Sequence, residues 1–464
     1  MEKTIAAIAT ALSNSGISII RVSGPEAISI SNRIFISPSG RSLDEFASNT
    51  INYGHIVDGE EIVDEVMLSV MRAPASYTRE DVIEINTHGG VLVTKKVLSL
   101  LLKNGAVLAE PGEFTKRAFL NGRIDLSRAE AIMELISAEN DCALKSGIKG
   151  LRGHVSDAIR AIRDKLIYEI AFIESALDDP EHISLDGYYE ELSGKIDAIY
   201  DELVLLSKSA DNGRIVREGI NTVILGKPNA GKSSLMNILI GEDRAIVTDI
   251  EGTTRDSLEE SMRIGSIHFR INDTAGIRDT DDTVEKIGVD RARNLAKDAD
   301  LVLFVVDSSR ELDDNDIDII NMTVSKKTLV LLNKNDLEPV IDSHKLCKLM
   351  INAGHNENDI KLLSISAKEN VGIDTLTNIA TDMFLSGDIG NSNEVMITNI
   401  RHKNAIDDAI NSLKMVKDSI SNNMPEDFLT IDILNAYSVL GTIIGEEVDD
   451  DLVTEIFSKF CMGK

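Results

Sequence analysis

The sequence predicts a multidomain chain with an α+β domain, then a helical domain into which a doubly wound α/β domain is inserted. Its 464 residues suggest roughly three domains. Short β-rich runs dominate residues 1–120, and apolar residues at helical spacing dominate residues 129–209 and the stretch beyond 400. Between these helical parts, apolar strands alternate with polar helices, which is typical of a parallel sheet covered on both faces.

The charge and cysteine content exclude several classes of protein. With 48 basic and 77 acidic residues the net charge is −29, so a nucleic-acid partner would have to meet a local basic patch. Cys142, Cys347 and Cys461 lie far apart, which disfavours a disulfide scaffold and a zinc module. No apolar run approaches the roughly 18 residues of a membrane helix. We therefore expect a cytoplasmic protein without membrane insertion.

Residues 1–120 form the predicted α+β domain. Residues 5–12 are apolar and follow Lys3, a pattern that faintly resembles a signal peptide. Because Glu2 offsets the single cation and the run is short, a first strand is the preferred interpretation. Further strands are predicted at residues 17–22, 61–70 and 81–85, and a helix at residues 91–104.

The helical domain is predicted in two parts, residues 121–215 and 385–464. Between Leu144 and Leu177 apolar residues recur every three or four positions without a proline, which predicts one long helix that ends before Pro180. Other helices are predicted at residues 195–209, 406–420 and 428–460.

The inserted α/β domain is predicted at residues 216–384. Its strands are predicted at residues 222–225, 267–271, 301–306 and 328–332. The first strand runs into residues 226–233 (GKPNAGKS), a complete phosphate-binding loop at the start of a helix. In such a loop the backbone N–H groups surround the phosphates, Lys232 neutralises their charge and the Ser233 hydroxyl ligates magnesium.

Further segments complete a nucleotide site in the required order. Residues 273–276 (DTAG) follow a strand and place a carboxylate beside the metal, and residues 252–256 (GTTRD) offer a threonine to magnesium. Residues 333–336 (NKND) end in Asp336, whose two oxygens can accept from guanine N1–H and the 2-amino group. Residues 366–368 (SAK) supply an amide for the guanine oxygen. The sequence therefore predicts a GTP-binding domain and not an ATPase.

The residue that follows Gly276 is informative about hydrolysis. Ras-like enzymes carry a water-orienting glutamine at that position, and this chain has Ile277. Another group must therefore hold the attacking water. The acidic stretch 278–285, which ends at Glu285, can supply it, although most carboxylates in such a stretch belong to a solvated loop.

Several strings along the chain together resemble one family. They are residues 73–85 (APASYTREDVIEI), 88–90 (HGG), 111–126 (PGEFTKRAFLNGRIDL), 247–256 (VTDIEGTTRD) and 461–464 (CMGK). With Asn229 in the phosphate-binding loop, they are similar to the MnmE (TrmE) family of tRNA modification GTPases. The resemblance covers nearly the whole chain, in family order.

The motifs and the resemblance together imply the nucleotide and metal contacts. The GTP-binding residues would be Asn229, Ala230, Gly231, Lys232, Ser233, Ser234, Thr248, Asp249, Ile250, Glu251, Gly252, Thr253, Thr254, Asp273, Thr274, Ala275, Gly276, Asn333, Lys334, Asp336, Ser366 and Ala367. Ser233 and Thr254 would bind Mg²⁺. The family's GTPase domains pair across K⁺, which Asn229 and the carbonyls of Thr248, Ile250 and Thr253 would hold. Glu285 matches the catalytic glutamate that orients water.

The resemblance also implies a second site, in the N-terminal domain. In the family this domain resembles folate-binding one-carbon enzymes, forms a homodimer and binds 5-formyltetrahydrofolate or a related one-carbon folate. The matching contacts are Arg21, Glu80, Arg123 and Lys464. Apart from the family, Arg21 and Glu80 would be interpreted as a surface ion pair.

The resemblance implies partners and a chemical product as well. Family members act with the flavin-dependent protein MnmG (GidA), in a heterotetramer or larger complex. Together they add an aminomethyl or carboxymethylaminomethyl group to C5 of the wobble uridine of certain tRNAs. Cys461 either closes a helix as a small apolar residue or takes part in this chemistry, with Lys459 and Lys464 favouring its thiolate.

A tRNA substrate would need a basic surface on this acidic chain. A candidate surface consists of Lys116, Arg117, Arg123, Arg128, Lys145, Lys149, Arg152, Arg160, Arg163 and Lys165. A helix face of mixed, solvated charge is an equally good interpretation of these residues.

Two alternative functions remain open from the sequence. A switch GTPase that acts in ribosome assembly without chemistry of its own would carry the same nucleotide motifs, but it needs neither an N-terminal folate-like domain nor a terminal thiol. A folate-dependent aminomethyl transferase merely regulated by GTP would bind folate through residues 1–120 alone.

Overall fold

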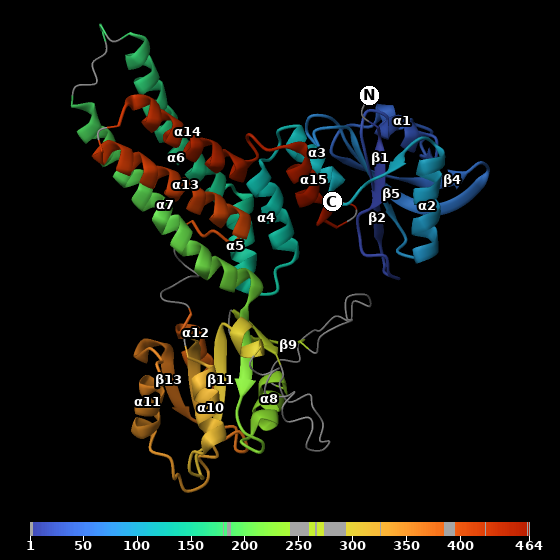
Figure 1. Ribbon diagram of the computed structural model, residues 1–464. Coiled ribbons are helices and arrows are strands. Elements are labelled where there is room, and N and C mark those ends of the chain that lie inside the picture. The colour runs from blue at the N-terminus through green and yellow to red at the C-terminus, as the bar shows by residue number, and fades with distance from the viewer. Residues whose placement is uncertain are drawn as a thin grey trace. The chain divides into compact units, whose positions relative to one another are not determined.

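The structure is a computed structural model that describes residues 3–179, 181–182, 187–241, 259–264, 267–272, 294–324, 326–384, 395–422, 424–461 and 463 (Figure 1). The chain divides into two compact units. One consists of Met1–Ile136, Ile148–Tyr200 and Ala405–Lys464, and the other of Ser137–Gly147 and Asp201–Asn404. The domain boundaries expected at residues 120, 215 and 384 stay predictions.

The N-terminal part of the first unit is built on a mixed sheet with the strand order β3-β4-β5-β6-β2-β1-β7. Its elements are β1 (Ile5–Ile8), β2 (Ser18–Ser23), α1 (Ala27–Asn32), β3 (Phe35–Ile36), the 3₁₀ helix η1 (Leu43–Glu45), β4 (Thr50–Asp58), β5 (Glu61–Met71), β6 (Val82–Thr87), α2 (Val91–Lys103) and β7 (Val107–Leu108). β1 pairs parallel with β7, and β1 with β2 antiparallel.

Helices α1 and α2 contact this sheet and bury one of its faces. Ile20, Leu68 and Ile85 from the strands join Val97 and Leu101 of α2 in one apolar cluster. Successive side chains of a strand point to opposite faces of the sheet, and this cluster covers one of those faces. The α+β pattern expected for this part of the chain is confirmed.

Helices make up the rest of the first unit and the connections into the second. They are α3 (Glu113–Leu120), α4 (Leu126–Ile136), α5 (Asp141–Leu151), α6 (His154–Asp178), α7 (Tyr188–Glu218), α13 (Ile400–Ser421), α14 (Glu426–Ile444) and α15 (Asp450–Ser458). α6 and α14 pack along each other, as Figure 1 shows.

The single long helix predicted between Leu144 and Leu177 is wrong, because α5 ends at Leu151 and α6 begins at His154. Between them, Gly153 adopts a left-handed φ of +93°. A Cβ on this glycine would lie 2.1 Å from the Arg128 guanidinium, so no other residue fits there without movement. Apolar residues continue at helical spacing on both sides of the break, which is why periodicity did not reveal it.

The helix predicted at residues 428–460 is also divided in two. α14 ends at Ile444 and α15 begins at Asp450, where Asp449 caps the new helix by accepting from the Leu452 amide at 2.8 Å. Among the described residues, no helix combines the length and the apolar character that crossing a membrane requires.

The second unit contains a doubly wound sheet with the strand order β13-β12-β11-β8-β10-β9. Its elements are β8 (Ile220–Leu225), α8 (Lys232–Gly241), β9 (Glu259–Ile264), β10 (Ile267–Asn272), β11 (Leu301–Asp307), α10 (Asp314–Met322), β12 (Lys327–Asn333), α11 (Ser343–Asn352), the 3₁₀ helix η2 (Glu357–Asp359), β13 (Ile360–Ser364) and α12 (Ile373–Asp382). Only the pairing of β9 with β10 is antiparallel among these described strands. β9 and β13 were not predicted from the sequence.

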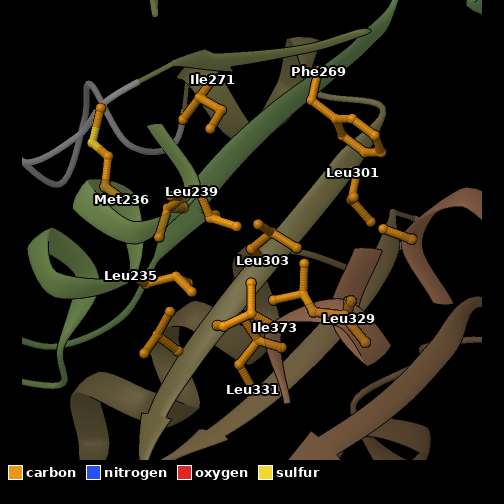
Figure 2. Packing of buried hydrophobic residues seen from close by; sticks show 14 of the residues in the cluster. Leu235, Met236, Leu239, Phe269, Ile271, Leu301, Leu303, Leu329, Leu331 and Ile373 are labelled. Carbon is orange, nitrogen blue, oxygen red and sulfur yellow. The ribbon is translucent and has the colours of Figure 1, made fainter. Parts of the chain in front are cut away.

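Apolar side chains fill both faces of this sheet. Figure 2 shows Leu235 and Leu239 of α8 on the same face as Leu303 of β11 and Leu331 of β12. The alternate residues of the same strands form a second cluster with α10 and α11 on the opposite face. Burial on both faces explains why β11 and β12 appear in the sequence as continuous apolar runs.

Candidate functional site

The phosphate-binding loop lies at the carboxyl end of β8, a central strand of the sheet. β8 lies between β10 and β11 and pairs with both. The chain passes from β8 to β10 on one side and then to β11 on the other side, so the strand order changes direction at β8. In doubly wound sheets such a change of direction leaves a crevice at the carboxyl ends of the strands, where ligands bind. Residues 226–231 follow β8 at this point and lead directly into α8.

The loop adopts a backbone shape that its residue types permit. Asn229 has a left-handed φ of +64°, a conformation that asparagine tolerates better than most residues. Gly231 has a φ of +101°, and a Cβ there would lie 2.1 Å from the Asn333 side-chain nitrogen. Glycine at position 231 therefore allows the loop to pack directly against the segment that follows β12.

Lys232, at the first position of α8, is held by the loop itself. Its Nζ donates to the carbonyl oxygen of Gly226 at 2.6 Å and to that of Lys227 at 2.8 Å. Ser233 and Ser234 follow in the first turn and are exposed. The α8 N-terminus, the ammonium and the Ser233 hydroxyl thus occupy one end of the helix, where backbone N–H groups and the helix dipole favour anions.

Asn333 joins three segments of the site. Its buried side-chain nitrogen donates to the carbonyl oxygen of Ala230 at 2.8 Å, and its side-chain oxygen accepts from the Ala367 amide at 2.9 Å. One amide therefore fixes the phosphate-binding loop relative to the segment predicted to contact guanine. The sequence placed Asn333 in the site but gave no indication of this bridging role.

Asp336 lies exposed beside the same segment. Its Oδ1 accepts from the buried Ser366 hydroxyl at 2.7 Å, and this hydrogen bond keeps the pKa of Asp336 below its usual value. The carboxylate therefore stays charged at neutral pH. It can accept from a base that offers two adjacent donors, as guanine does.

Lys334, between Asn333 and Asp336, is anchored from the neighbouring strand. Its Nζ lies 2.6 Å from Oδ2 of Asp307, the last residue of β11. Burial alone would raise the pKa of Asp307, but Lys334 and Ser309 outweigh that effect and lower it. Asp307 was not predicted from the sequence as a site residue. The only signal for it was the position of an acid at the end of an apolar strand.

The remaining predicted GTP, magnesium and potassium contacts lie outside the described residues. They are Thr248, Asp249, Ile250, Glu251, Gly252, Thr253, Thr254, Asp273, Thr274, Ala275 and Gly276. The water-orienting Glu285 lies outside them too.

In the first unit, two of the predicted folate contacts meet around one aromatic ring. The guanidinium carbon of Arg21 lies 5.6 Å from the centre of the Tyr77 ring and that of Arg123 lies 4.7 Å from it. Arg21 also lies 5.6 Å from the Phe114 ring centre. Tyr77 and Phe114 were not predicted from the sequence as site residues, although both lie within the strings that carried the family resemblance.

Glu80 does not pair with Arg21. It accepts from Arg117 at 3.0 Å and from the Ser23 hydroxyl at 2.6 Å, whereas Arg21 pairs with Glu84 at 2.8 Å. The interpretation of Arg21 and Glu80 as a mutual ion pair is therefore wrong. Glu80 also lines a cavity of about 700 Å³, together with Lys3, Thr4, Pro25, Glu26, Ala73, Asp81 and Gly105.

The C-terminal segment lies against this part of the first unit. Arg21 donates to the carbonyl oxygen of Gly463 at 3.1 Å, and the Gly112 amide donates to that of Cys461 at 3.3 Å. Cys461 is exposed, so it does not close the core of α15 as a packed apolar residue. Lys459 pairs with Glu455 at 3.0 Å, and the predicted folate contact Lys464 lies outside the described residues.

Two arginines of the candidate basic surface are buried in the structure. Arg117 is buried and pairs with Glu80 and Glu113. Arg163 is buried as well, stacks over the Tyr437 ring and forms an ion pair with Glu446. Neither arginine therefore presents its charge to a phosphate backbone.

Comparison with known proteins identifies the family. Residues 4–123 match the model of the GTP-binding protein TrmE N-terminus, and residues 126–461 match that of the MnmE helical domain. A tRNA modification GTPase MnmE from Lachnoclostridium phytofermentans is 53% identical over 462 residues, 99% of each chain. One from Clostridioides difficile is 46% identical over 464 residues, 100% of each chain.

A solved structure of Aquifex aeolicus Era bound to GDP and aluminium fluoride is also similar. It is 23% identical and has a TM-score of 0.27, with 42% of this chain and 66% of that chain covered. A score this low carries no argument about function, whereas the two full-length relatives are far above the similarity that unrelated chains reach. The chain belongs to the MnmE family of tRNA modification GTPases.

Proposed function

We propose that this chain binds and hydrolyses GTP and takes part in the modification of the wobble uridine of tRNA. The bridge made by Asn333 supports the first half of the proposal, because it joins the phosphate-binding loop to the Ala367 amide, and Asp336, which would accept from guanine, follows three residues later. Family membership supports the second half, since the full-length relatives are named for tRNA modification.

The described residues fit a magnesium nucleotide. The Ser233 hydroxyl is exposed at the start of α8, where it would ligate Mg²⁺ together with Thr254. When bound, the ion neutralises charge that develops on the phosphates. Lys232 would contact the β- and γ-phosphates, and Asp336 would select guanine through its two carboxylate oxygens. Glu285 would hold the attacking water in place of the missing glutamine.

We extend the proposal to potassium. Asn229 is exposed in a left-handed turn of the loop and carries a side-chain oxygen, the type of ligand that a monovalent cation takes. With the carbonyls of Thr248, Ile250 and Thr253, it would place K⁺ where an arginine finger acts in other GTPases. This arrangement would form between the GTPase domains of a homodimer.

The N-terminal part would bind 5-formyltetrahydrofolate or a related one-carbon folate. Arg21 and Arg123 converge on Tyr77, so cationic and aromatic groups suited to an anionic, ring-containing ligand lie together. Glu80 lines the neighbouring cavity, and Lys464 would complete the set. Cys461 is exposed beside this region and would take part in the modification, with MnmG as the flavin-dependent partner.

Nucleoside mass spectrometry of tRNA tests the whole proposal. In cells that lack this protein, the C5-modified wobble uridine should disappear, and the wild-type gene should restore it. A gene for the Asp336→Asn variant should restore it poorly. Unchanged tRNA modification in the deletion strain would favour the alternative, a switch GTPase without chemistry of its own.

A further inference from the structure

The phosphate-binding loop carries a second lysine, Lys227, whose ammonium group forms ion pairs with two carboxylates. Its Nζ lies 2.7 Å from Oδ2 of Asp316 and 2.9 Å from Oδ2 of Asp313. Both acids stand at the start of α10, the helix that follows β11. The loop and this helix are therefore joined by an ion pair that no sequence motif indicates.

The two carboxylates are also held by hydrogen bonds at the start of α10. Asp313 is the N-cap residue of α10, and its side chain accepts from the amides of Asn315 and Asp316. Asp316 accepts in return from the Asp313 amide at 3.1 Å. Acidic residues are favoured at such positions because unpaired N–H groups and the helix dipole attract them.

Stability alone does not explain why the charge of Asp316 is buried. Asp316 is 1% exposed, and its Oδ1 has no hydrogen-bond partner among the described residues. Burial lowers the pKa of Lys227, but its hydrogen bonds to Asp316 and Asp313 outweigh that effect and raise it, so the pair stays ionised. A buried ion pair with an unsatisfied oxygen is commonly no more stable than an apolar pair of similar size.

The backbone of Lys227 is hydrogen-bonded within the phosphate-binding loop. Its carbonyl oxygen accepts from the Lys232 ammonium at 2.8 Å and from the Ala230 amide at 3.3 Å. A connected path therefore runs from α10 through the Lys227 side chain and backbone to Lys232. Misplacement of a phosphate-contacting group by about 1 Å can cost a hundredfold in rate.

We propose that Asp316, supported by Asp313, is a positioning residue that holds Lys227 and thereby sets the phosphate-binding loop and Lys232 in the geometry that receives nucleotide phosphates. The proposal rests on the proposed GTP-binding function. It assigns the two loop lysines different tasks: Lys232 meets phosphate, whereas Lys227 anchors the loop to α10.

The test measures the affinity of the full-length chain for fluorescent mant-GTP and mant-GDP, below the melting temperature of every variant. Asp316→Asn removes the charge at nearly constant size, and Lys227→Met keeps the apolar stem. Each substitution should weaken the binding of both nucleotides at least tenfold and raise the KM for GTP to the same extent. Lys227→Arg should stay within about threefold of the wild type. Asp314→Asn, an exposed acid in the same helical turn, is the matched control and should change nothing.

Several outcomes decide the proposal. If Asp316→Asn lowers the melting temperature but leaves nucleotide affinity within twofold, the pair is structural only and the proposal is wrong. The apolar double variant Lys227→Met with Asp316→Leu should recover thermal stability but not affinity, and recovered affinity would also overturn the proposal. If the wild-type chain itself fails to bind mant-GTP, the proposed function fails first, and this inference falls with it.

Discussion

The side-chain nitrogen of Asn333 donates to the carbonyl oxygen of Ala230 at 2.8 Å, so the end of β12 directly supports the phosphate-binding loop. The same amide accepts from Ala367 and thereby couples the two halves of the nucleotide site. Because both hydrogen bonds are buried, the Ala230 carbonyl and the Ala367 amide cannot hydrogen-bond to water instead when the Asn333 side chain is removed.

Asn333→Ala should therefore impair both folding stability and nucleotide binding. Two buried partners lose their hydrogen bonds, which predicts a loss of about 2–4 kcal/mol in the stability of the GTPase part. Scanning calorimetry and mant-GTP titration measure the two effects. Asn335→Ala, at the exposed position two residues later, should change stability by less than about 0.5 kcal/mol. If the Asn333→Ala chain is destabilised but binds mant-GTP with normal affinity, Asn333 has a structural role only.

Asp336→Asn should change the preferred base. An asparagine at this position offers an N–H donor in place of one carboxylate oxygen, so it suits the 2-oxo group of xanthine better than the 2-amino group of guanine. GTP affinity should fall about 10- to 100-fold while xanthosine triphosphate affinity rises. Competition binding measures the relative affinity for GTP and xanthosine triphosphate. Glu338→Gln, at an exposed position, is the control. Equal losses for both nucleotides would mean that Asp336 does not contact the base.

The hydrogen bond from Ser366 to Asp336 should set the acid limit of GTP binding. It lowers the pKa of Asp336, so the accepting carboxylate persists to a lower pH than an ordinary aspartate, and affinity is lost only as the pH falls through that lowered value. Ser366→Ala should raise this pKa and move the loss of GTP affinity to higher pH. Affinity at pH 7 should change little, since the carboxylate is charged in both chains. Identical pH profiles would contradict this coupling.

GTP hydrolysis should be slow in sodium salts and at least tenfold faster in potassium salts. An arginine finger contributes 10³- to 10⁵-fold in related enzymes, and K⁺ bound through Asn229 would replace part of that contribution. Asn229→Gly removes the ligand while permitting the left-handed φ of +64°. It should abolish the potassium effect and preserve GTP binding. Equal wild-type rates in the two salts would count decisively against a potassium site.

Cys461→Ser should separate tRNA modification from GTP hydrolysis. The thiol is exposed, so a serine of nearly equal size should leave the melting temperature and GTPase rate near those of the wild type. The modified nucleoside should disappear from tRNA, as mass spectrometry can show. Cys347→Ser, in α11, provides the matched control. Normal tRNA modification by the Cys461 variant would remove the thiol from the chemistry.

The sequence predicted those parts of the site that depend on local pattern. β8 and β12 could be identified because strands buried on both faces form continuous apolar runs, and the motifs after them have a fixed spacing. β13 was missed because its five residues (IKLLS) mix exposed and buried positions and have no alternation to reveal them. The break at Gly153 was missed because a glycine within a helical pattern is often tolerated.

Contacts between distant segments could not be predicted in the same way. The ion pair between Lys227 and Asp316 depends on which helix packs beside the loop, and neither residue type is unusual at its position. The convergence of Arg21 and Arg123 on Tyr77 likewise arises from the packing of strand β2 against two loops. Such pairings follow from topology, which periodicity does not encode.

The contact between Arg21 and Gly463 has a consequence for synthesis and for protein engineering. The two residues are separated by 442 positions in the chain, and Figure 1 shows the red C-terminal segment beside the blue strands β1 and β2. During translation the N-terminal sheet can assemble long before Gly463 leaves the ribosome, so this contact is among the last to form. An affinity tag fused after Lys464 would begin two positions after Gly463, whereas a tag before Met1 leaves Gly463 and Cys461 in their native covalent context.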